Sequence, residues 1–267
     1  MNSAAAMGLA VPEAVTVAMA EQAADVVYGP ALLSVTMNEL VDAVGALSPR
    51  PRGPRWASLS SCLVDAVWSI NVDYDTVTVP ITRAVFTSCT GDDTNPLVAP
   101  DDLSTPDPVR LDAFLARFPD VDTLLAVSNR QRTSTRGGIL KADAVLQYAA
   151  VLIDAGVHTR LDALAVMDDD GRFSDINEQL RRIPGDGADG IRRGYFWMLI
   201  GDDSGIKPDR MVLRWLAAHG THITAPEASQ TLRHIATELT ERSGTTVTPW
   251  MVDHTIWLAA RKLPRTQ

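Results

Sequence analysis

Residues 183–187 carry the stretch IPGDG, and residues 207–214 carry KPDRMVLR. A Pro-Gly-x-Gly turn between two helices leaves backbone N–H groups free at the start of the second helix, because glycine tolerates positive φ values and close backbone approach. These N–H groups and the helix dipole suit a phosphate oxygen, bound directly or through a monovalent cation. In the second stretch, Asp209 follows Pro208 and is placed to cap a helix. Taken alone, that acid is most simply interpreted as an N-cap worth about 1 kcal/mol.

Outward from these stretches, the chain is a series of segments with helical periodicity, separated by proline and glycine. The clearest amphipathic pattern lies at Ile139–Ala155. Strong strand character is confined to Thr76–Val79, so we predict an all-α fold. Helices are expected over Val11–Tyr28, Ala31–Leu47, Leu59–Ile70, Thr76–Ser88, Val109–Phe118, Val121–Val127, Ile139–Ala155, Asp175–Ile183, Ile191–Ile200, Asp209–Ala218, Pro226–Arg242 and Pro249–Lys262.

A proline- and arginine-rich linker at residues 48–54 is predicted to separate an N-terminal extension, residues 1–54, from a helical domain, residues 55–267, because it cannot continue a helix. The first 49 residues contain five acids and no base. Their apolar content predicts two helices that pack against the domain, a second copy of the chain or a partner protein. The alternative is a free acidic arm that competes with an anionic ligand for basic side chains.

The composition is that of a globular protein, with 46% apolar and 21% charged residues in a chain of 267. No apolar run approaches the ~20 residues that span a bilayer, and the start lacks the positive charge of a signal peptide, so we expect a cytoplasmic protein without membrane contact. Two cysteines, Cys62 and Cys89, exclude a four-cysteine metal or iron–sulfur site. The net charge of −9 disfavours nucleic acid as a partner, although bases gather within residues 130–141 and 181–214.

Together and in this order, the two stretches resemble the helix-hairpin-helix/Gly-Pro-Asp superfamily of DNA glycosylases, the endonuclease III-like group. That family has a Leu-Pro-Gly-Val-Gly hairpin and a Val-Asp-x-x-Val-x-Arg segment that carries a catalytic aspartate. Further similar pieces lie in the expected order at residues 60–74, 138–142 and 253–257. The resemblance covers residues 56–262, and residues 1–54 have no counterpart in it.

The resemblance implies a two-lobed all-α fold in which a helix-hairpin-helix motif holds DNA and a nucleotide is flipped into the cleft between the lobes. Asp209 would be the catalytic residue, which stabilises positive charge on the deoxyribose or positions the attacking water. The implied activity is hydrolysis of the N-glycosidic bond of a damaged or modified base, a step of base-excision DNA repair. Beyond a monovalent cation at the hairpin, the resemblance implies no cofactor and no metal.

The hairpin and the basic groups supply the other candidate site residues. For DNA contact these are Gly185, Gly187, Lys141, Arg192, Arg193 and Arg214. The rings that could line a base pocket are Trp68, Tyr74 and Tyr195, because aromatic side chains stack on nucleobases. Packing into the core is the alternative for each of these rings.

Three features depart from the family pattern. The lysine with which bifunctional members form a Schiff base is replaced by Asp189, so we expect no lyase activity. The iron–sulfur loop is absent, and Asp186 stands where the hairpin has an apolar residue. Two carboxylates beside a phosphate-binding turn repel DNA unless a cation intervenes. The alternative to an enzyme is therefore a catalytically degenerate module on the same fold that binds nucleic acid or protein.

Overall fold

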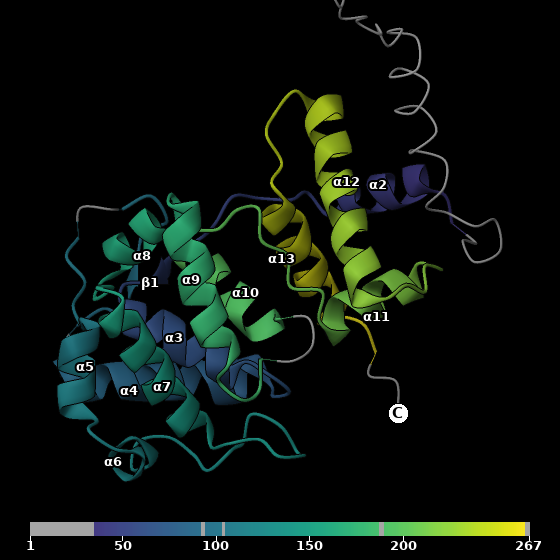
Figure 1. The fold of residues 1–267 in the computed structure, drawn as a ribbon. Coiled ribbons are helices and arrows are strands. Elements are labelled where there is room, and N and C mark those ends of the chain that lie inside the picture. Colours follow the sequence, from purple (N-terminus) through teal and green to yellow (C-terminus); the bar gives the residue numbers. More distant parts are fainter. Residues whose placement is uncertain (1–34, 92–93, 103–104, 187–189, 265–267) are drawn as a thin grey trace, which may run out of the picture.

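The computed structural model of the protein describes residues 35–91, 94–102, 105–186 and 190–264. Figure 1 shows helices joined by loops, and the strands of the described part are one antiparallel pair, β1 (Arg55–Trp56) and β2 (Leu97–Val98). The all-α prediction is therefore confirmed. The helices are α2 (Met37–Ala46), α3 (Leu59–Trp68), the π-helical turn η1 (Tyr74–Thr78), α4 (Val79–Thr90), α5 (Leu111–Arg117), α6 (Val121–Leu125), α7 (Lys141–Asp154), α8 (Arg160–Met167), α9 (Asp170–Arg181), α10 (Ile191–Ile200), α11 (Arg210–Ala218), α12 (Ala225–Ser243) and α13 (Pro249–Ala260).

Two segments differ in kind from the sequence pattern. Residues 76–79, which have strand character, lie in η1 and at the start of α4, because the Asp73 side chain accepts a hydrogen bond from the Thr76 N–H and begins a helical turn. Periodicity does not predict α8, which begins at a capping box between Thr159 and Asp162. In both places a local side-chain acceptor starts the helix where the apolar pattern is weak.

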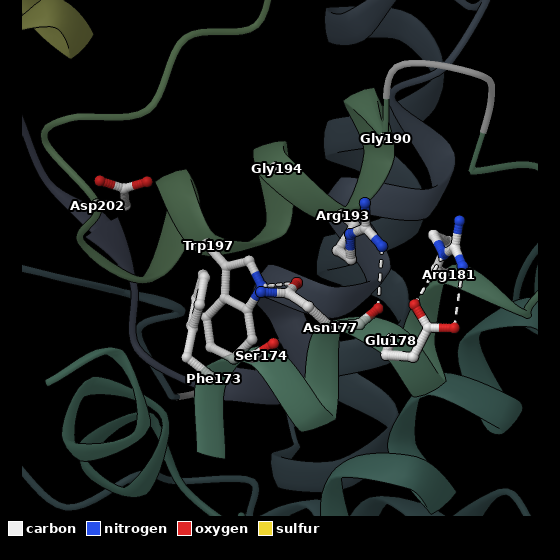
Figure 2. Close-up of a pocket in the computed structure, with 10 residues that line it drawn as sticks. All are labelled: Phe173, Ser174, Asn177, Glu178, Arg181, Gly190, Arg193, Gly194, Trp197 and Asp202. Carbon is white, nitrogen blue, oxygen red and sulfur yellow. Dashed lines mark hydrogen bonds and ion pairs between the residues drawn. The ribbon is translucent and has the colours of Figure 1, made fainter. Parts of the chain in front are cut away.

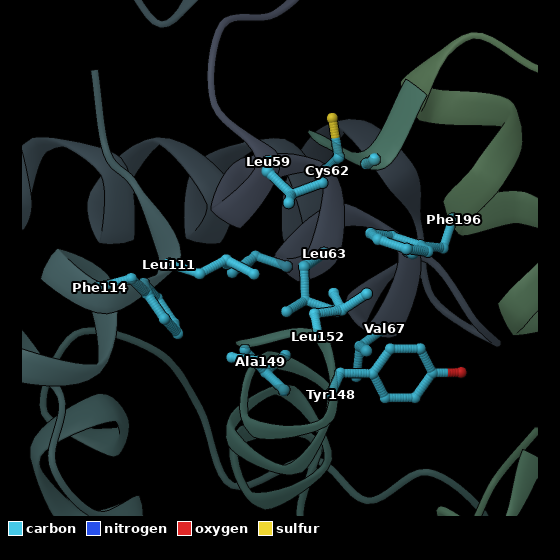
Figure 3. Packing of buried hydrophobic residues seen from close by; sticks show 14 of the residues in the cluster. Leu59, Cys62, Leu63, Val67, Leu111, Phe114, Tyr148, Ala149, Leu152 and Phe196 are labelled. Carbon is cyan, nitrogen blue, oxygen red and sulfur yellow. The ribbon is translucent and has the colours of Figure 1, made fainter. Parts of the chain in front are cut away.

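The larger hydrophobic core is built around α3, whose ten residues are all buried. Helices α4, α7 and α10 contact α3, and Figure 3 shows α3 side chains packed among those of α5, α7 and α10. A helix without a polar face belongs inside a bundle, which explains why α3 has no solvent-exposed side. The acid of α3, Asp65, is enclosed with the rest of the helix.

A second hydrophobic core brings together helices from both ends of the described chain. Helix α2 contributes Leu40, Val41 and Val44, which are at most 2% exposed, and α11, α12 and α13 supply the remainder. In Figure 1 these four helices lie beside the bundle around α3. Helix α2 corresponds to the second helix expected within residues 1–54, and the first, Val11–Tyr28, lies outside the described residues.

The linker around Arg52 is held between the two cores. The Arg52 guanidinium donates to Asp203 Oδ1 and to the Met198 carbonyl, each at 2.7 Å. It also lies 4.1 Å from the ring centroid of Trp250, which stacks on His254 of α13. Because these partners come from the end of α10, the following loop and α13, the linker contacts both cores.

Helix α2 offers a test of the second core, because one of its leucines is buried and the next leucine in the sequence is exposed. Leu40 is 2% exposed, whereas Leu47, just beyond the helix, is 38% exposed. Leu40→Ala should lower the free energy of unfolding by about 2–5 kcal/mol, the usual cost of emptying a buried leucine site. Leu47→Ala, the matched control, should change it by less than about 0.5 kcal/mol. Denaturant unfolding measures both, and equal losses would contradict the packing of α2.

Candidate functional site

Residues 207–214 lead into α11 at the junction of the two cores. Asp209 is the N-cap of α11, and its Oδ1 accepts hydrogen bonds from the N–H groups of Met211 at 2.7 Å and Val212 at 3.2 Å. The interpretation of Asp209 as an N-cap is therefore confirmed. The residue remains partly exposed, so two backbone donors fix the direction of a carboxylate that solvent can reach.

A buried carboxyl group from α13 holds the backbone just before Asp209. Asp253 is 5% exposed, and its Oδ1 accepts a hydrogen bond from the Lys207 N–H at 3.0 Å. The Lys207 carbonyl accepts in turn from the Asp209 N–H at 2.7 Å. Burial raises the pKa of Asp253 to about 8, and the Lys207 N–H opposes this rise. The position of Asp209 is thus linked to α13 through the backbone of Lys207.

The Lys207 side chain extends from this segment to the larger core. Its Nζ donates to Ser69 Oγ, just beyond α3, at 3.2 Å and lies 3.5 Å from the ring centroid of Tyr195 on α10. Desolvation lowers the pKa of Lys207, and the negative charge of Asp209 makes the largest contribution against that shift. The ammonium group is therefore held between a hydroxyl group and an aromatic face, on a residue that stays partly exposed.

Asp65 lies next to the two tyrosines of this region. It is fully buried, and its Oδ2 accepts hydrogen bonds from the Tyr74 hydroxyl at 2.6 Å and from Trp56 Nε1 at 2.7 Å. Among the described residues its Oδ1 has no hydrogen-bond partner. Burial raises the pKa of Asp65, and the hydrogen bonds from Tyr74 and Trp56 oppose the rise. Burial, followed by the charge of Asp65, also raises the pKa of Tyr195.

We call these six residues the junction cluster: Asp65, Tyr74, Tyr195, Lys207, Asp209 and Asp253. Three of them, Asp209, Tyr74 and Tyr195, are predicted site residues that the structure brings together, and the sequence analysis does not name the other three as site residues. Asp65 has a signal in the sequence, since it is the charged residue of the apolar segment 59–68. The shifted pKa values of Asp65, Tyr195, Lys207 and Asp253, gathered at one place, are typical of a functional site, which makes this junction the candidate site.

Residues 183–186 belong to the turn between α9 and α10, while Gly187 and Asp189 lie outside the described residues. Gly185 has a φ of +99°, and a Cβ atom at this position would lie 2.2 Å from the Cβ of Thr133. Both the backbone conformation and the close approach require glycine here. The role expected for Gly185 in phosphate binding stays a prediction.

Asp186 occupies the start of α10, where the resemblance places a phosphate. Its Oδ1 accepts a hydrogen bond from the Arg193 N–H at 3.1 Å, and its Oδ2 lies 3.5 Å from Arg193 Nη2. Asp186 is 5% exposed, so a carboxylate of the chain itself satisfies this helix start. Arg193 also donates from Nη1 to the Asn177 carbonyl at 2.9 Å, which ties its guanidinium to α9.

Two of the predicted DNA contacts need correction, because their side chains are buried and use their donors inside the protein. Lys141 is 2% exposed, and its Nζ donates to the carbonyls of Trp68 at 2.9 Å and Ile70 at 2.8 Å. Arg192 is fully buried and donates to two carbonyls of the hairpin turn at 2.8 and 2.9 Å. Carbonyl acceptors offset the cost of burying these charges, so neither side chain is available to a phosphate.

Two further residues that the sequence predicts for the site, Trp68 and Arg214, instead make hydrogen bonds within the protein. Trp68 is fully buried, and its Nε1 donates to Asn129 Oδ1 at 3.2 Å, so the core alternative holds for this ring. Arg214 is partly buried and donates from Nη2 to the Ala260 carbonyl at the end of α13. Of the predicted pocket rings, Tyr74 and Tyr195 therefore remain.

A groove of about 660 Å³ runs between α9 and α10, and Figure 2 shows the residues that line it. Arg181 and Glu178 form an ion pair at 2.9 Å on its wall, and Trp197 Nε1 donates to Asn177 Oδ1 at 2.9 Å. The described lining residues include no member of the junction cluster. The groove therefore flanks the hairpin and lies apart from the candidate site.

The chain belongs to a family defined by a domain of unknown function, DUF8548, whose model matches residues 36–261. The matched region begins just before α2 and ends just after α13, so it includes both cores and the linker between them. No curated protein and no solved structure matches the chain.

Within the described residues, no helix combines the length and the apolar character needed to cross a bilayer. The same part of the chain contains no group of three or more histidine, cysteine or acidic side chains placed to hold a metal ion.

The raised pKa of Asp253 predicts how stability changes with pH. The folded protein keeps the Asp253 proton up to about pH 8, whereas the ordinary pKa is 3.8. Between these values the folded state binds more protons than the unfolded state, so this group makes stability fall as the pH rises. Asp253→Asn keeps an acceptor for the Lys207 N–H and removes the titration.

The Asn variant should therefore be more stable than the wild type at about pH 9, and its stability should change less between about pH 5 and pH 9. Denaturant unfolding across this range measures the difference. Parallel pH profiles for the two proteins would show that Asp253 is not protonated in the folded state.

Proposed function

We propose that this protein is a DNA glycosylase that hydrolyses the N-glycosidic bond of a damaged or modified base and has no lyase activity. The observation that carries the proposal is the position of Asp209, a partly exposed carboxylate held by two backbone donors at the junction of the two cores. The two cores support the two-lobed arrangement that the resemblance implies. The α9–turn–α10 unit supports its hairpin.

The chemistry needs a negative charge that is in place before the reaction begins. Breaking the bond between C1′ of the deoxyribose and the base nitrogen leaves positive charge on the sugar, and a carboxylate that is already oriented stabilises it without reorganisation. Asp209 meets this requirement, since its own helix supplies the capping donors and Asp253 anchors the preceding backbone. The same carboxylate would accept a proton from the attacking water. This reaction needs no cofactor.

For the flipped base we propose a place beside Tyr74 and Tyr195, the partly exposed rings of the junction cluster. Tyr74 is fixed by its hydrogen bond to Asp65 and by an edge-to-face contact with Trp257, with 5.6 Å between the ring centroids. Rigid rings stack on a base of any sequence. Arg193, with a side-chain exposure of 20%, is the remaining phosphate contact that we propose near the hairpin.

The test is release of a base from duplex oligonucleotides that each carry one damaged or modified base, by the wild type and by Asp209→Asn. Asn caps a helix about as well as Asp, so this variant keeps α11 and loses only the charge. We expect the rate to fall by about 10²–10³-fold, the range for removing one preorganised electrostatic contact, while the melting temperature stays the same. Alkaline cleavage at the abasic site reports the product.

Two further variants complete the design. Glu241→Gln changes an exposed acid of α12 and should keep the full rate. Asp209→Ala removes the cap as well as the charge, so it should lose about 1 kcal/mol of stability together with the activity. Equal rates for the wild type and Asp209→Asn would remove Asp209 from the mechanism. A wild type that releases no base would defeat the enzymatic proposal.

Asp186 favours a second candidate function, a non-catalytic module that binds nucleic acid or protein. Its carboxylate fills the start of α10 and pairs with Arg193, so a phosphate could reach this helix start only by displacing it. The net charge of −9 also opposes DNA binding. In this case the acidic residues 1–54 would supply a surface for a partner protein or a second copy.

Asp186→Asn tests the two candidates through DNA affinity. The variant keeps an acceptor for the Arg193 N–H, removes a negative charge and releases the Arg193 guanidinium from its ion pair. We expect binding to duplex DNA to become several-fold tighter at about 50 mM salt, and the gain to shrink as salt screens the charges. Fluorescence anisotropy measures the affinities, with Asp122→Asn on α6 as an exposed control. If neither protein binds at low salt, DNA is excluded as the partner.

A further inference from the structure

Lys207 has hydrogen-bond donors that the protein does not use. An ammonium group has three N–H donors. Among the described residues, Lys207 Nζ makes one hydrogen bond, to Ser69 Oγ. The Tyr195 ring covers another side of the group, with its centroid at 3.5 Å. This ammonium group belongs to a partly exposed residue and therefore keeps the capacity to donate to a ligand.

Lys141 shows the contrasting case of a lysine whose role is structural. Its Nζ donates to the carbonyls of Trp68 and Ile70 and lies 3.5 Å from Gln131 Oε1, so its three donors have three acceptors. Both lysines reach the end of α3, and the positive charge of Lys207 contributes to the lowered pKa of Lys141. Three acceptors within the protein compensate for the burial of the Lys141 ammonium group. A purely structural role does not explain why Lys207 has donors without an acceptor in the described residues.

Lys207 and Asp209 belong to one rigid segment. The Asp209 N–H donates to the Lys207 carbonyl at 2.7 Å, and the buried residue between them is Pro208. The charge of Asp209 is the strongest of those that favour the Lys207 ammonium. A substrate placed against the Asp209 carboxylate would therefore lie in the electrostatic field of both groups.

We propose that Lys207 donates the proton to the departing base, an inference that rests on the proposed function at Asp209. The Nζ proton passes to a ring nitrogen of the base while the bond between C1′ and the base breaks, and the electron pair of that bond stays with the base. The water oxygen bonds to C1′ and gives one proton to Asp209. The products are the free base, an abasic deoxyribose, a neutral Lys207 amine and a protonated Asp209, whose proton returns to Lys207 through solvent.

The surroundings of Lys207 suit a group that must give up a proton near neutral pH. Burial lowers the pKa of Lys207, and the charge of Asp209 keeps it from falling further. The titratable groups that face this region from the elements packed around it are Asp65 of α3, Tyr74 of η1, Lys141 of α7, Tyr195 of α10, Asp209 before α11 and Asp253 of α13.

The first experiment asks whether a small reagent reaches Lys207 and needs no enzymatic activity. The full-length protein is treated with a low concentration of acetic anhydride, and mass spectrometry gives the acetylation rate of each lysine. We expect Lys207 to react many times faster than Lys141, because its donors are not saturated, and exposed Lys262 provides the upper reference. If Lys207 reacts no faster than Lys141, it is not open to a substrate and the inference fails, whatever the protein does to DNA.

The second experiment separates proton donation from positive charge. Duplex oligonucleotides carry uracil or 5-fluorouracil, whose anion is the better leaving group and depends less on a proton donor. Lys207→Met should reduce the rate with uracil by about 10²–10⁴-fold, the range for general acid catalysis, and the rate with 5-fluorouracil by much less. Lys207→Arg keeps the charge but holds its proton, so it should resemble Lys207→Met. Lys262→Met is the surface control and should be unchanged.

The pH profile completes the test. The wild-type rate should decline at alkaline pH as Lys207 loses its proton, and this decline should be absent in Lys207→Met. Activity restored by Lys207→Arg, or the same loss with both bases, would show a structural or charge role and overturn the inference while the proposed function stands. A wild type that releases neither base nor any other, although Lys207 is reactive, would overturn the proposed function and the inference with it.

Discussion

The hydrogen bond between the Asp253 carboxyl group and the Lys207 N–H sets the geometry of the junction. It joins α13 to the loop after α10 across 46 positions of the sequence, and a buried N–H left without its acceptor would cost about 1–3 kcal/mol. With that backbone fixed, Asp209 can cap α11 and the Lys207 side chain can reach Ser69. The positions of the Asp209 carboxylate and the Lys207 ammonium group therefore depend on one buried acceptor, which binds the backbone between the two cores.

The rest of the junction is held by rings and charges more than by aliphatic packing. Trp250, His254 and Trp257 stack along one face of α13, with interplanar angles of 13° and 17°. Arg52 and Arg261 lie over the outer rings, and they form ion pairs with Asp203, after α10, and Asp75, in η1. Contacts of this kind lie between the two hydrophobic cores, so the boundary between the cores is lined by rings and charged groups.

Local patterns in the sequence predict much of the fold, whereas contacts between distant segments determine which residues meet at the candidate site. The period of residues 139–155 predicts α7, and the order Pro208-Asp209 predicts the capped start of α11, because both signals involve neighbouring residues. Lys141 and Arg192 are misassigned from sequence, since a long charged side chain looks the same whether water or carbonyl groups surround it. The two carbonyl acceptors of Lys141 lie 71 and 73 positions away, so no local pattern predicts them.

Asp186 and Asp209 both cap the start of a helix, but the two carboxylates differ in exposure and in charge pairing. Each carboxylate accepts a backbone N–H in the first turn of a helix. Asp186 is buried and its charge is paired with Arg193, so its capping stabilises the hairpin and leaves nothing for a ligand. Asp209 is partly exposed and forms no ion pair within 4.0 Å in the described part of the chain. A capping carboxylate whose charge is neutralised by an ion pair can only stabilise the fold. A capping carboxylate without an ion pair can also stabilise a cation that forms beside it. That difference separates the two helix starts: the Asp186 charge is used within the α9–α10 turn, whereas the Asp209 charge is not used by an ion pair of the described chain.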